Sequence, residues 1–324
     1  MSEPAFRTGV VAIGRDEGER LKRCLRSLQN VRGPVTYVDS ASTDGSAEEA
    51  RALGAQVVPL DVTQPFTAAR ARAAGVAAME RDCRAPEFLF FVDGDCEVEE
   101  GFVESAENFL DRHSDVATVC GRRRERFPHA TRYNALIDRE WNTPVGEALA
   151  CGGDAVYRYS AYREAGGFDP AMLAGEEPEL CARLKGLGWR IFRMDVPMTV
   201  HDAAMTEWSQ WWGRAVRSGM GYLQAWLQTR RHAGRPLYGK ELLRSVLWAG
   251  VLPLVALVLS VVLSPLALLI WPLVTAAQYA RLARRSGGFA AWLSIAGKYA
   301  ELTGIIRYAV RAIAGRSGST VHYK

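Results

Sequence analysis

Short apolar runs rich in β-favouring residues alternate with segments of helical periodicity over roughly the first 120 residues. Helices are predicted where apolar residues such as Leu21, Leu25 and Leu28 recur three and four positions apart. Strands that alternate with helices form mostly parallel sheets with right-handed crossovers, so the pattern predicts an α/β fold. The predicted strands lie at residues 8–13, 35–38, 56–60 and 88–93.

The predicted strand at residues 88–93 is almost wholly apolar and leads into Asp93-Gly94-Asp95. A continuous apolar run of this length is typical of a buried central strand. Ligands of open α/β sheets bind beyond the carboxyl ends of the strands, so Asp93 and Asp95 lie where a substrate is expected. Two carboxylates at this spacing suit Mg²⁺ or Mn²⁺ held against a phosphate. The alternative is a surface turn, because Asp-Gly is a common turn dipeptide.

Other acidic residues follow the neighbouring strands. Asp16 and Glu17 come after the first strand, and Asp39 comes directly after the second. The carboxyl ends of parallel strands share one rim of a sheet, so we expect these acids to gather beside Asp93 and Asp95.

The chain continues with a basic run that includes Arg123, followed by a long polar stretch to Ala150. A charge run is usually a solvated face, but its position after a core strand favours a loop beside the site. The predicted elements around it are a helix at residues 101–112 and strands at residues 116–121, 189–194 and 196–200.

Composition and charge narrow the class of protein. The 324 residues, 48% of them hydrophobic, allow one large α/β domain and an appendage. The net charge of +4 is unevenly placed, and one basic cluster precedes the longest apolar run, which favours membrane headgroups over nucleic acid. The six cysteines lack the spacing of a zinc site, and we expect reduced thiols. No signal peptide is expected, because no apolar segment precedes the first strand. The cluster before the apolar run comprises Arg230, Arg231, Arg235, Lys240 and Arg244.

Residues 242–277 are almost uncharged apart from Arg244 and are longer than the roughly 20 residues that one membrane span needs. Two spans that turn near Ser264 fit this length, and a re-entrant hairpin is the alternative. Basic residues at both flanks place both ends on the cytoplasmic side. Residues 289–313 follow an amphipathic pattern, which predicts a helix lying on the membrane. We therefore expect three parts: residues 1–230 as the catalytic domain, 231–285 as a helical hairpin, and 286–324 as a membrane-surface helix and tail.

Several stretches resemble a known family. Over roughly residues 8–230 the chain resembles the family 2 glycosyltransferases, nucleotide-sugar enzymes with a GT-A, Rossmann-like fold. The resemblance implies that Asp39 contacts the base or ribose of the donor, that Arg72 lies near the base or the diphosphate, and that Asp95 holds a metal ion. Ala73 stands where many relatives have asparagine, which leaves a solvated helix arginine as the alternative for Arg72. The stretches are residues 10–17, 38–46, 69–75 and Asp93-Gly94-Asp95, which resembles the family's DxD motif.

The second half of the resemblance concerns catalysis. The family's Glu-Asp pair, whose second residue is the base that deprotonates the acceptor, corresponds here to Glu176 and Glu177. Glu177 is the expected base and Glu176 the alternative, although acids at a helix start are also favoured by the helix dipole alone. His201, at a strand end, is the expected third metal ligand, with a structural histidine as the alternative. The expected nucleotide site comprises Asp16, Glu17, Asp39, Arg72, Asp93 and Gly94, and the expected metal site comprises Asp95, Asp93 and His201.

These observations predict an inverting glycosyltransferase that depends on Mg²⁺ or Mn²⁺. It would move a sugar from a nucleoside diphosphate sugar to a lipid-linked or polysaccharide acceptor, at the cell inner membrane with the catalytic domain in the cytoplasm and without nucleic acid. A nucleotidyltransferase is one alternative, but it needs a glycine-rich, lysine-bearing loop after the first strand, and Gly14-Arg15-Asp16-Glu17 is not such a loop. A non-catalytic membrane scaffold is the other.

Overall fold

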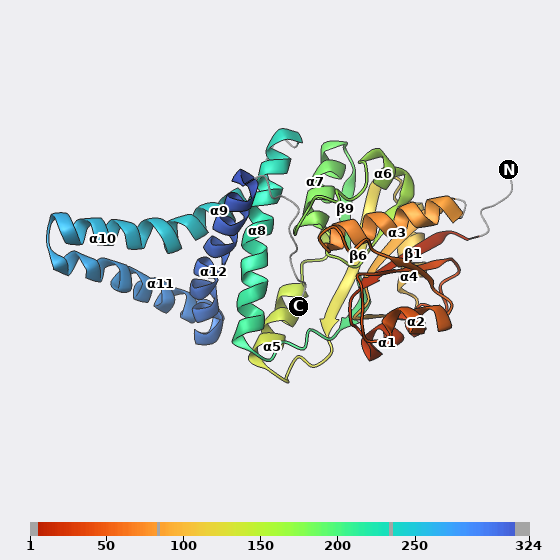
Figure 1. The fold of residues 1–324 in the computed structure, drawn as a ribbon, viewed down its shortest axis with the longest axis horizontal. Coiled ribbons are helices and arrows are strands. Elements are labelled where there is room, and N and C mark those ends of the chain that lie inside the picture. The colour runs from red at the N-terminus through yellow and green to blue at the C-terminus, as the bar shows by residue number, and fades with distance from the viewer. Residues whose placement is uncertain (1–5, 83–84, 233–235, 315–324) are drawn as a thin grey trace.

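The computed structural model describes residues 6–82, 85–232 and 236–314. Arg235 of the basic cluster, Cys83 and the predicted tail at residues 315–324 lie outside the described residues. A body of sheet and helices occupies one end of the molecule, and two long helices project from the other (Figure 1). This arrangement agrees with the predicted α/β domain and C-terminal helical hairpin.

One mixed sheet organises the body. Within the described residues its strands run in the order β3-β2-β1-β4-β8-β6-β9-β5, and β7 pairs with β9. The first four are parallel, as the sequence predicts, whereas β8 runs antiparallel to both β4 and β6. The strands are β1 Thr8–Gly14, β2 Val35–Asp39, β3 Gln56–Pro59, β4 Phe88–Asp93, β5 Cys96–Val98, β6 Val116–Glu125, β7 Gly146–Glu147, β8 Ala155–Arg158 and β9 Arg190–His201.

Helices connect and cover these strands. Most coincide with predicted helices, but α5 falls inside the stretch that we expected to be irregular. Its start is capped, because the Thr131 hydroxyl accepts a hydrogen bond from the Asn134 backbone N–H. The helices of the body are α1 Glu19–Ser27, α2 Ser46–Ala52, α3 Ala68–Asp82, α4 Phe102–Arg112, α5 Arg132–Trp141, α6 Tyr159–Glu164, α7 Glu176–Gly186 and α8 Trp208–His232.

The central strand β4 is buried as predicted. All five of its apolar residues have no exposed surface, and Phe91 makes edge contacts with the rings of Tyr157 and Phe168. Each fully buried side chain of this kind contributes about 1.5–3 kcal/mol relative to an exposed one. The acidic end of β4 is therefore carried by a strand whose apolar residues are fully buried.

Two strand predictions need correction. The basic run that we expected to be a loop is the second half of β6, which pairs with β9 up to Glu125 opposite His201. Residues 190–201 form one long strand rather than two, and its register with β6 shifts at several points, as at a β-bulge. The arginines are tolerated in a strand because alternate side chains point to opposite faces.

The projecting hairpin consists of two helices that are long and apolar enough to cross a membrane, at Gly239–Val262 and Pro265–Ser286. They meet at Leu263 and Ser264, where the sequence predicts the turn. Apolar side chains cover the outside of the hairpin, and Val261 and Leu266 are 80% and 73% exposed. The first helix comprises α9 Gly239–Val246, the π-helical segment η1 Leu247–Val251 and α10 Leu252–Val262, and the second comprises η2 Pro265–Leu269 and α11 Ile270–Ser286.

The last helix, α12 Gly288–Ile313, lies along α8. Glycines bring the two backbones into direct contact. A Cβ atom at Gly219 would lie 2.0 Å from the Glu301 carbonyl oxygen, and one at Gly304 would lie 2.0 Å from that of Val216. One face of α12 is thus buried against the body, and the predicted position of this helix on a membrane surface stays a prediction.

Candidate active site

A cavity of about 290 Å³ opens where β1 and β4 end, between the first turns of α3 and α7. The strands deliver their last residues to this rim of the sheet, and the two helices begin there. Seven of the predicted site residues line the cavity: Glu17, Arg72, Asp93, Gly94, Asp95, Glu176 and Glu177. The sequence therefore found most of this cluster, although the residues come from four separate segments.

Asp16 and Asp39 lie close by but do not line the cavity. The Asp39 carboxylate is buried, and it accepts hydrogen bonds from the Ser42 N–H at 3.0 Å and the Tyr37 hydroxyl at 3.3 Å. Asp16 accepts a hydrogen bond from the Thr43 N–H at 2.7 Å. In this structure both acids hold the loop after β2, and their contact with a nucleotide stays a prediction.

Arg72 is the centre of the acidic cluster. Only 2% of its side chain is exposed, so it is not a solvated helix arginine. One guanidinium nitrogen donates to Glu176 at 2.6 Å and to Glu177 at 3.2 Å, and another donates to Asp93 at 2.8 Å. Charge-assisted bonds of this kind are stronger than neutral ones, so a single cation holds three carboxylates together.

Arg123 is a second buried cation, and the sequence alone assigned it no role in the site. It comes from the basic run on β6 and donates to Asp93 at 2.8 Å and to Asp154 at 2.9 Å. Asp154 is fully buried and also accepts from the Asp93 backbone N–H and from the Thr199 hydroxyl. Although burial alone would raise the pKa of Asp93, Arg72 and Arg123 hold it well below its usual range.

Gly153 lets this network pack. A Cβ atom there would lie 2.5 Å from a guanidinium nitrogen of Arg72 and 2.9 Å from an oxygen of Asp93. Any side chain at this position would therefore push the pair apart. A Cβ atom at Gly152, the preceding residue, would have no neighbouring atom within 4 Å.

Asp95 and His201 form the part of the site that fits a metal ion. A carboxylate oxygen of Asp95 lies 3.1 Å from Nε2 of His201, and Nδ1 of His201 has no hydrogen-bond partner among the described residues. Carboxylate oxygens suit both Mg²⁺ and Mn²⁺, whereas an imidazole nitrogen is a ligand of transition metals, and Cys96 brings a thiol within 4.8 Å of both. Both carboxylate oxygens of Asp93 accept hydrogen bonds from arginines, one from Arg72 and one from Arg123. Asp93 would therefore have to release one of these arginines to bind a metal ion as predicted.

Glu176 and Glu177 differ in their surroundings. Burial, together with the negative charge of Glu176, raises the pKa of Glu177 from 4.5 to about 7, and Arg72 opposes the rise. A carboxylate whose pKa lies near neutrality is suited to accept a proton. Glu176 is buried and receives the shorter bond from Arg72, which leaves Glu177 the more accessible of the two.

A second cavity of about 290 Å³ adjoins the first on the side of α8. Glu177 lines both cavities, whereas Glu176 lines only the first. Arg214, Arg217 and Tyr222, all on α8, line the second cavity. Glu177 thus stands at the junction of two spaces, one bordered by the acidic strand end and the other by basic and aromatic side chains.

Comparison with protein families agrees with this arrangement. The profile of "Glycosyl transferase family group 2" matches residues 90–280, and that of "Glycosyl transferase family 2" matches residues 10–164. The chain belongs to the family 2 glycosyltransferases. The two matches together cover the residues that line the first and second cavities, and the hairpin as far as residue 280.

A curated relative of this chain is the pre-mycofactocin glycosyltransferase of Mycobacterium tuberculosis. The two are 31% identical over 225 residues, which cover 62% of this chain and 44% of the relative. The chain thus spans less than half the length of the curated relatives that it matches.

Solved structures confirm the GT-A type of fold. The mannosyltransferase PcManGT from Pyrobaculum calidifontis, in complex with GDP-Man and Mn²⁺, superposes with a TM-score of 0.60 at 16% identity, over 95% of this chain and 88% of that one. GalNAc-T7, with UDP, GalNAc and Mn²⁺, gives a TM-score of 0.52 at 14% identity, over 78% of this chain and 52% of that one.

Proposed function

We propose that this chain is an inverting, metal-dependent glycosyltransferase of the cytoplasmic face of a bacterial-type inner membrane. It transfers a sugar from a nucleoside diphosphate sugar to a hydroxyl group of a lipid-linked or polysaccharide acceptor. The observation that carries the proposal is the position of Glu177 between two cavities, because a base for this reaction must reach the acceptor while it faces the donor.

The donor belongs in the cavity beneath Asp93 and Asp95. Structures of similar fold contain GDP-Man or UDP together with Mn²⁺, which supports a nucleotide sugar as the ligand. A Mg²⁺ or Mn²⁺ ion held by Asp95 and His201 would supply positive charge to the diphosphate leaving group. Arg72 and Arg123 keep the Asp93 carboxylate ionised and fixed at the end of β4.

The acceptor belongs in the second cavity. Its hydroxyl oxygen would attack the anomeric carbon from the side opposite the diphosphate, while Glu177 takes the hydroxyl proton. The bond between the anomeric carbon and the diphosphate oxygen breaks as the new glycosidic bond forms, so the configuration at that carbon inverts. Tyr222 and the arginines of α8 offer a ring and guanidinium donors for a saccharide or a phosphate.

The membrane location rests on the hairpin. Its two helices have the length and apolarity of membrane spans, and their outward side chains are exposed. Basic residues flank both ends of the hairpin, which supports a cytoplasmic position for the catalytic body. Nucleotide sugars would reach the donor cavity from that side.

Thermal unfolding of the full chain in detergent tests the donor part of the proposal. A panel of nucleotides and nucleotide sugars, each with and without Mn²⁺, should reveal a ligand that raises the melting temperature only when the metal is present. That ligand should then support sugar transfer by the wild type and not by Glu177→Gln, which should still bind it. The proposal would be contradicted if no nucleotide sugar in the panel raised the melting temperature in a metal-dependent way.

A further inference from the structure

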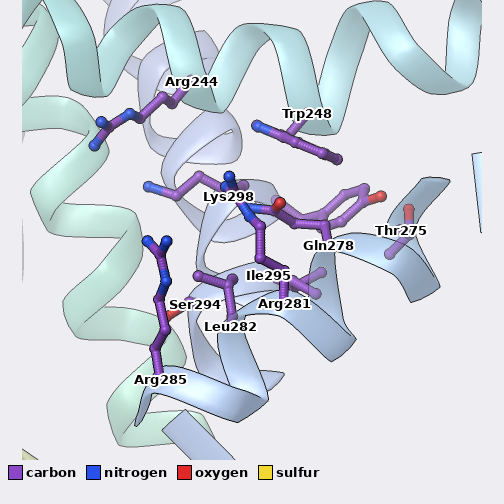
Figure 2. A pocket seen from close by; sticks show the side chains of 11 residues that line it. Arg244, Trp248, Thr275, Gln278, Arg281, Leu282, Arg285, Ser294, Ile295 and Lys298 are labelled. Atoms are coloured by element: carbon purple, nitrogen blue, oxygen red, sulfur yellow. The ribbon is translucent and has the colours of Figure 1, made fainter. Parts of the chain in front are cut away.

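A basic cavity of about 450 Å³ lies at the foot of the hairpin, away from the acidic cluster. Four cationic side chains from three helices line it: Arg244 of α9, Arg281 and Arg285 of α11, and Lys298 of α12. No acidic residue is among its lining residues. Figure 2 shows the charged ends of these side chains turned toward one space, with Trp248 beside them.

The three arginines of this cavity have no carboxylate partner among the described residues. Within the part of the chain that the structure describes, the side chains of Arg244, Arg281 and Arg285 make no ion pair and no hydrogen bond. Lys298 alone is paired, with Glu301 at 2.6 Å. Like charges that converge in this way repel one another, so a multivalent anion in the cavity would stabilise the arrangement. Guanidinium groups bind phosphate with two parallel hydrogen bonds, which makes phosphate the anion that fits best.

The position of the cavity indicates that the phosphate is attached to an apolar chain. Arg244 precedes the apolar part of the first hairpin helix, and Arg281 follows that of the second. The cavity therefore lies at the level where the exposed leucines and valines of the hairpin give way to charge. Aromatic residues lie at the same level, since Trp248 and Tyr299 line the cavity.

We propose that this cavity binds the phosphate group of an anionic membrane lipid, with the lipid chain running along α10 and α11. The lipid has two possible sources, an anionic phospholipid of the bilayer or a polyprenyl phosphate carrier. The proposal rests on the membrane association proposed above, but it does not rest on sugar transfer.

A third cavity, of about 450 Å³, lies between this basic cavity and the second cavity of the active site. It shares the lining residues Ser294 and Lys298 with the basic cavity, and Arg214 and Tyr222 with the second cavity. The basic cavity and the acceptor side of Glu177 are therefore neighbours across one further cavity. This proximity is the structural reason to include a lipid carrier among the ligands tested.

The test compares Arg281→Gln/Arg285→Gln with Arg284→Gln, a matched control on the same helix whose side chain does not line the cavity. The full chain in neutral detergent at about 0.15 M salt is titrated with phosphatidylglycerol, a polyprenyl phosphate, phosphatidylcholine or inorganic phosphate, and the melting temperature is recorded. We expect an anionic lipid to stabilise the wild type and Arg284→Gln alike. The double variant should need at least roughly tenfold more of it, because two of the phosphate's guanidinium partners are lost.

The responses to the different ligands distinguish a bilayer phospholipid from a polyprenyl phosphate carrier. Stabilisation by both anionic lipids supports a bilayer phospholipid, and stabilisation by the polyprenyl phosphate alone supports the carrier. An equal response of the double variant and Arg284→Gln would overturn the proposal, as would stabilisation by inorganic phosphate at the same concentrations as the lipids. Metal-dependent stabilisation by the nucleotide sugar should be the same in all three proteins, so failure of the lipid site remains distinct from failure of the donor site.

Discussion

The raised pKa of Glu177 leads to a prediction about the pH dependence of sugar transfer. Burial and the charge of Glu176 raise this pKa from 4.5 to about 7, and the proposed mechanism requires the ionised form. Roughly a tenth of Glu177 would then be ionised at about pH 6 and roughly nine tenths at about pH 8. The turnover number at saturating donor and metal should therefore rise roughly tenfold between these values, whereas a carboxylate of ordinary pKa would give a flat profile.

The neighbouring acid provides the matched test. Glu176→Gln removes the negative charge that raises the pKa of Glu177, so the acidic limb of the profile should move to lower pH while the plateau persists. Glu177→Gln should lower turnover by roughly 10²-fold to 10⁴-fold at the plateau, and its residual activity should lack the limb. A flat wild-type profile, or a limb that Glu176→Gln leaves in place, would refute the assignment of the base.

The raised pKa of Glu177 also predicts that the folded state becomes less stable as the pH rises. Because the pKa is raised in the folded state, ionisation of Glu177 opposes folding, and the penalty appears as the pH rises from about 4.5 to about 7. A rise of this size corresponds to about 3 kcal/mol. Glu177→Gln should therefore unfold at a higher temperature than the wild type at about pH 8, and the difference should shrink toward about pH 5.

Three further predictions concern the metal site, the packing of the arginine cluster and the hairpin. Asp95→Ala should remove the Mn²⁺-dependent part of nucleotide binding, measured by calorimetry, and leave the melting temperature of the apo protein within a few degrees. Gly153→Ala should destabilise the chain by about 1–3 kcal/mol and weaken donor binding, because its Cβ enters the Arg72–Asp93 pair, whereas Gly152→Ala should be nearly neutral. A single cysteine at Ser264, in a chain without its other cysteines, should react with a membrane-impermeant reagent from outside the cell if both helices cross. Protection at Ser264 would favour a re-entrant hairpin.

Local pattern was enough to predict most of the sheet and the position of the acids. The strand before Asp93 could be recognised because an apolar run that ends in two carboxylates is typical of a central strand that leads into the ligand site of an α/β sheet. The turn of the hairpin at Leu263 and Ser264 followed from length alone.

The partners of the buried arginines could not be predicted in this way. Arg72 and Glu176 are 104 residues apart, and Arg123 and Asp154 are 31 apart, so no local pattern links them. Four arginines in five positions favour a solvated loop when charge alone is considered. Alternation along the strand was the missed signal: Arg123 points toward the site, whereas Arg124 on the opposite face is half exposed.

The contact between α8 and α12 has a consequence for which acceptors can be used. Backbones that touch at Gly219 and Gly304 leave little room for one helix to slide along the other. In the proposed membrane orientation, this helix pair rather than a flexible tether would fix the distance between the catalytic cleft and the bilayer. If the acceptor is a lipid-linked saccharide, as proposed, the protein would select acceptors by reach, since a chain too short to span that distance would leave its terminal sugar away from the base.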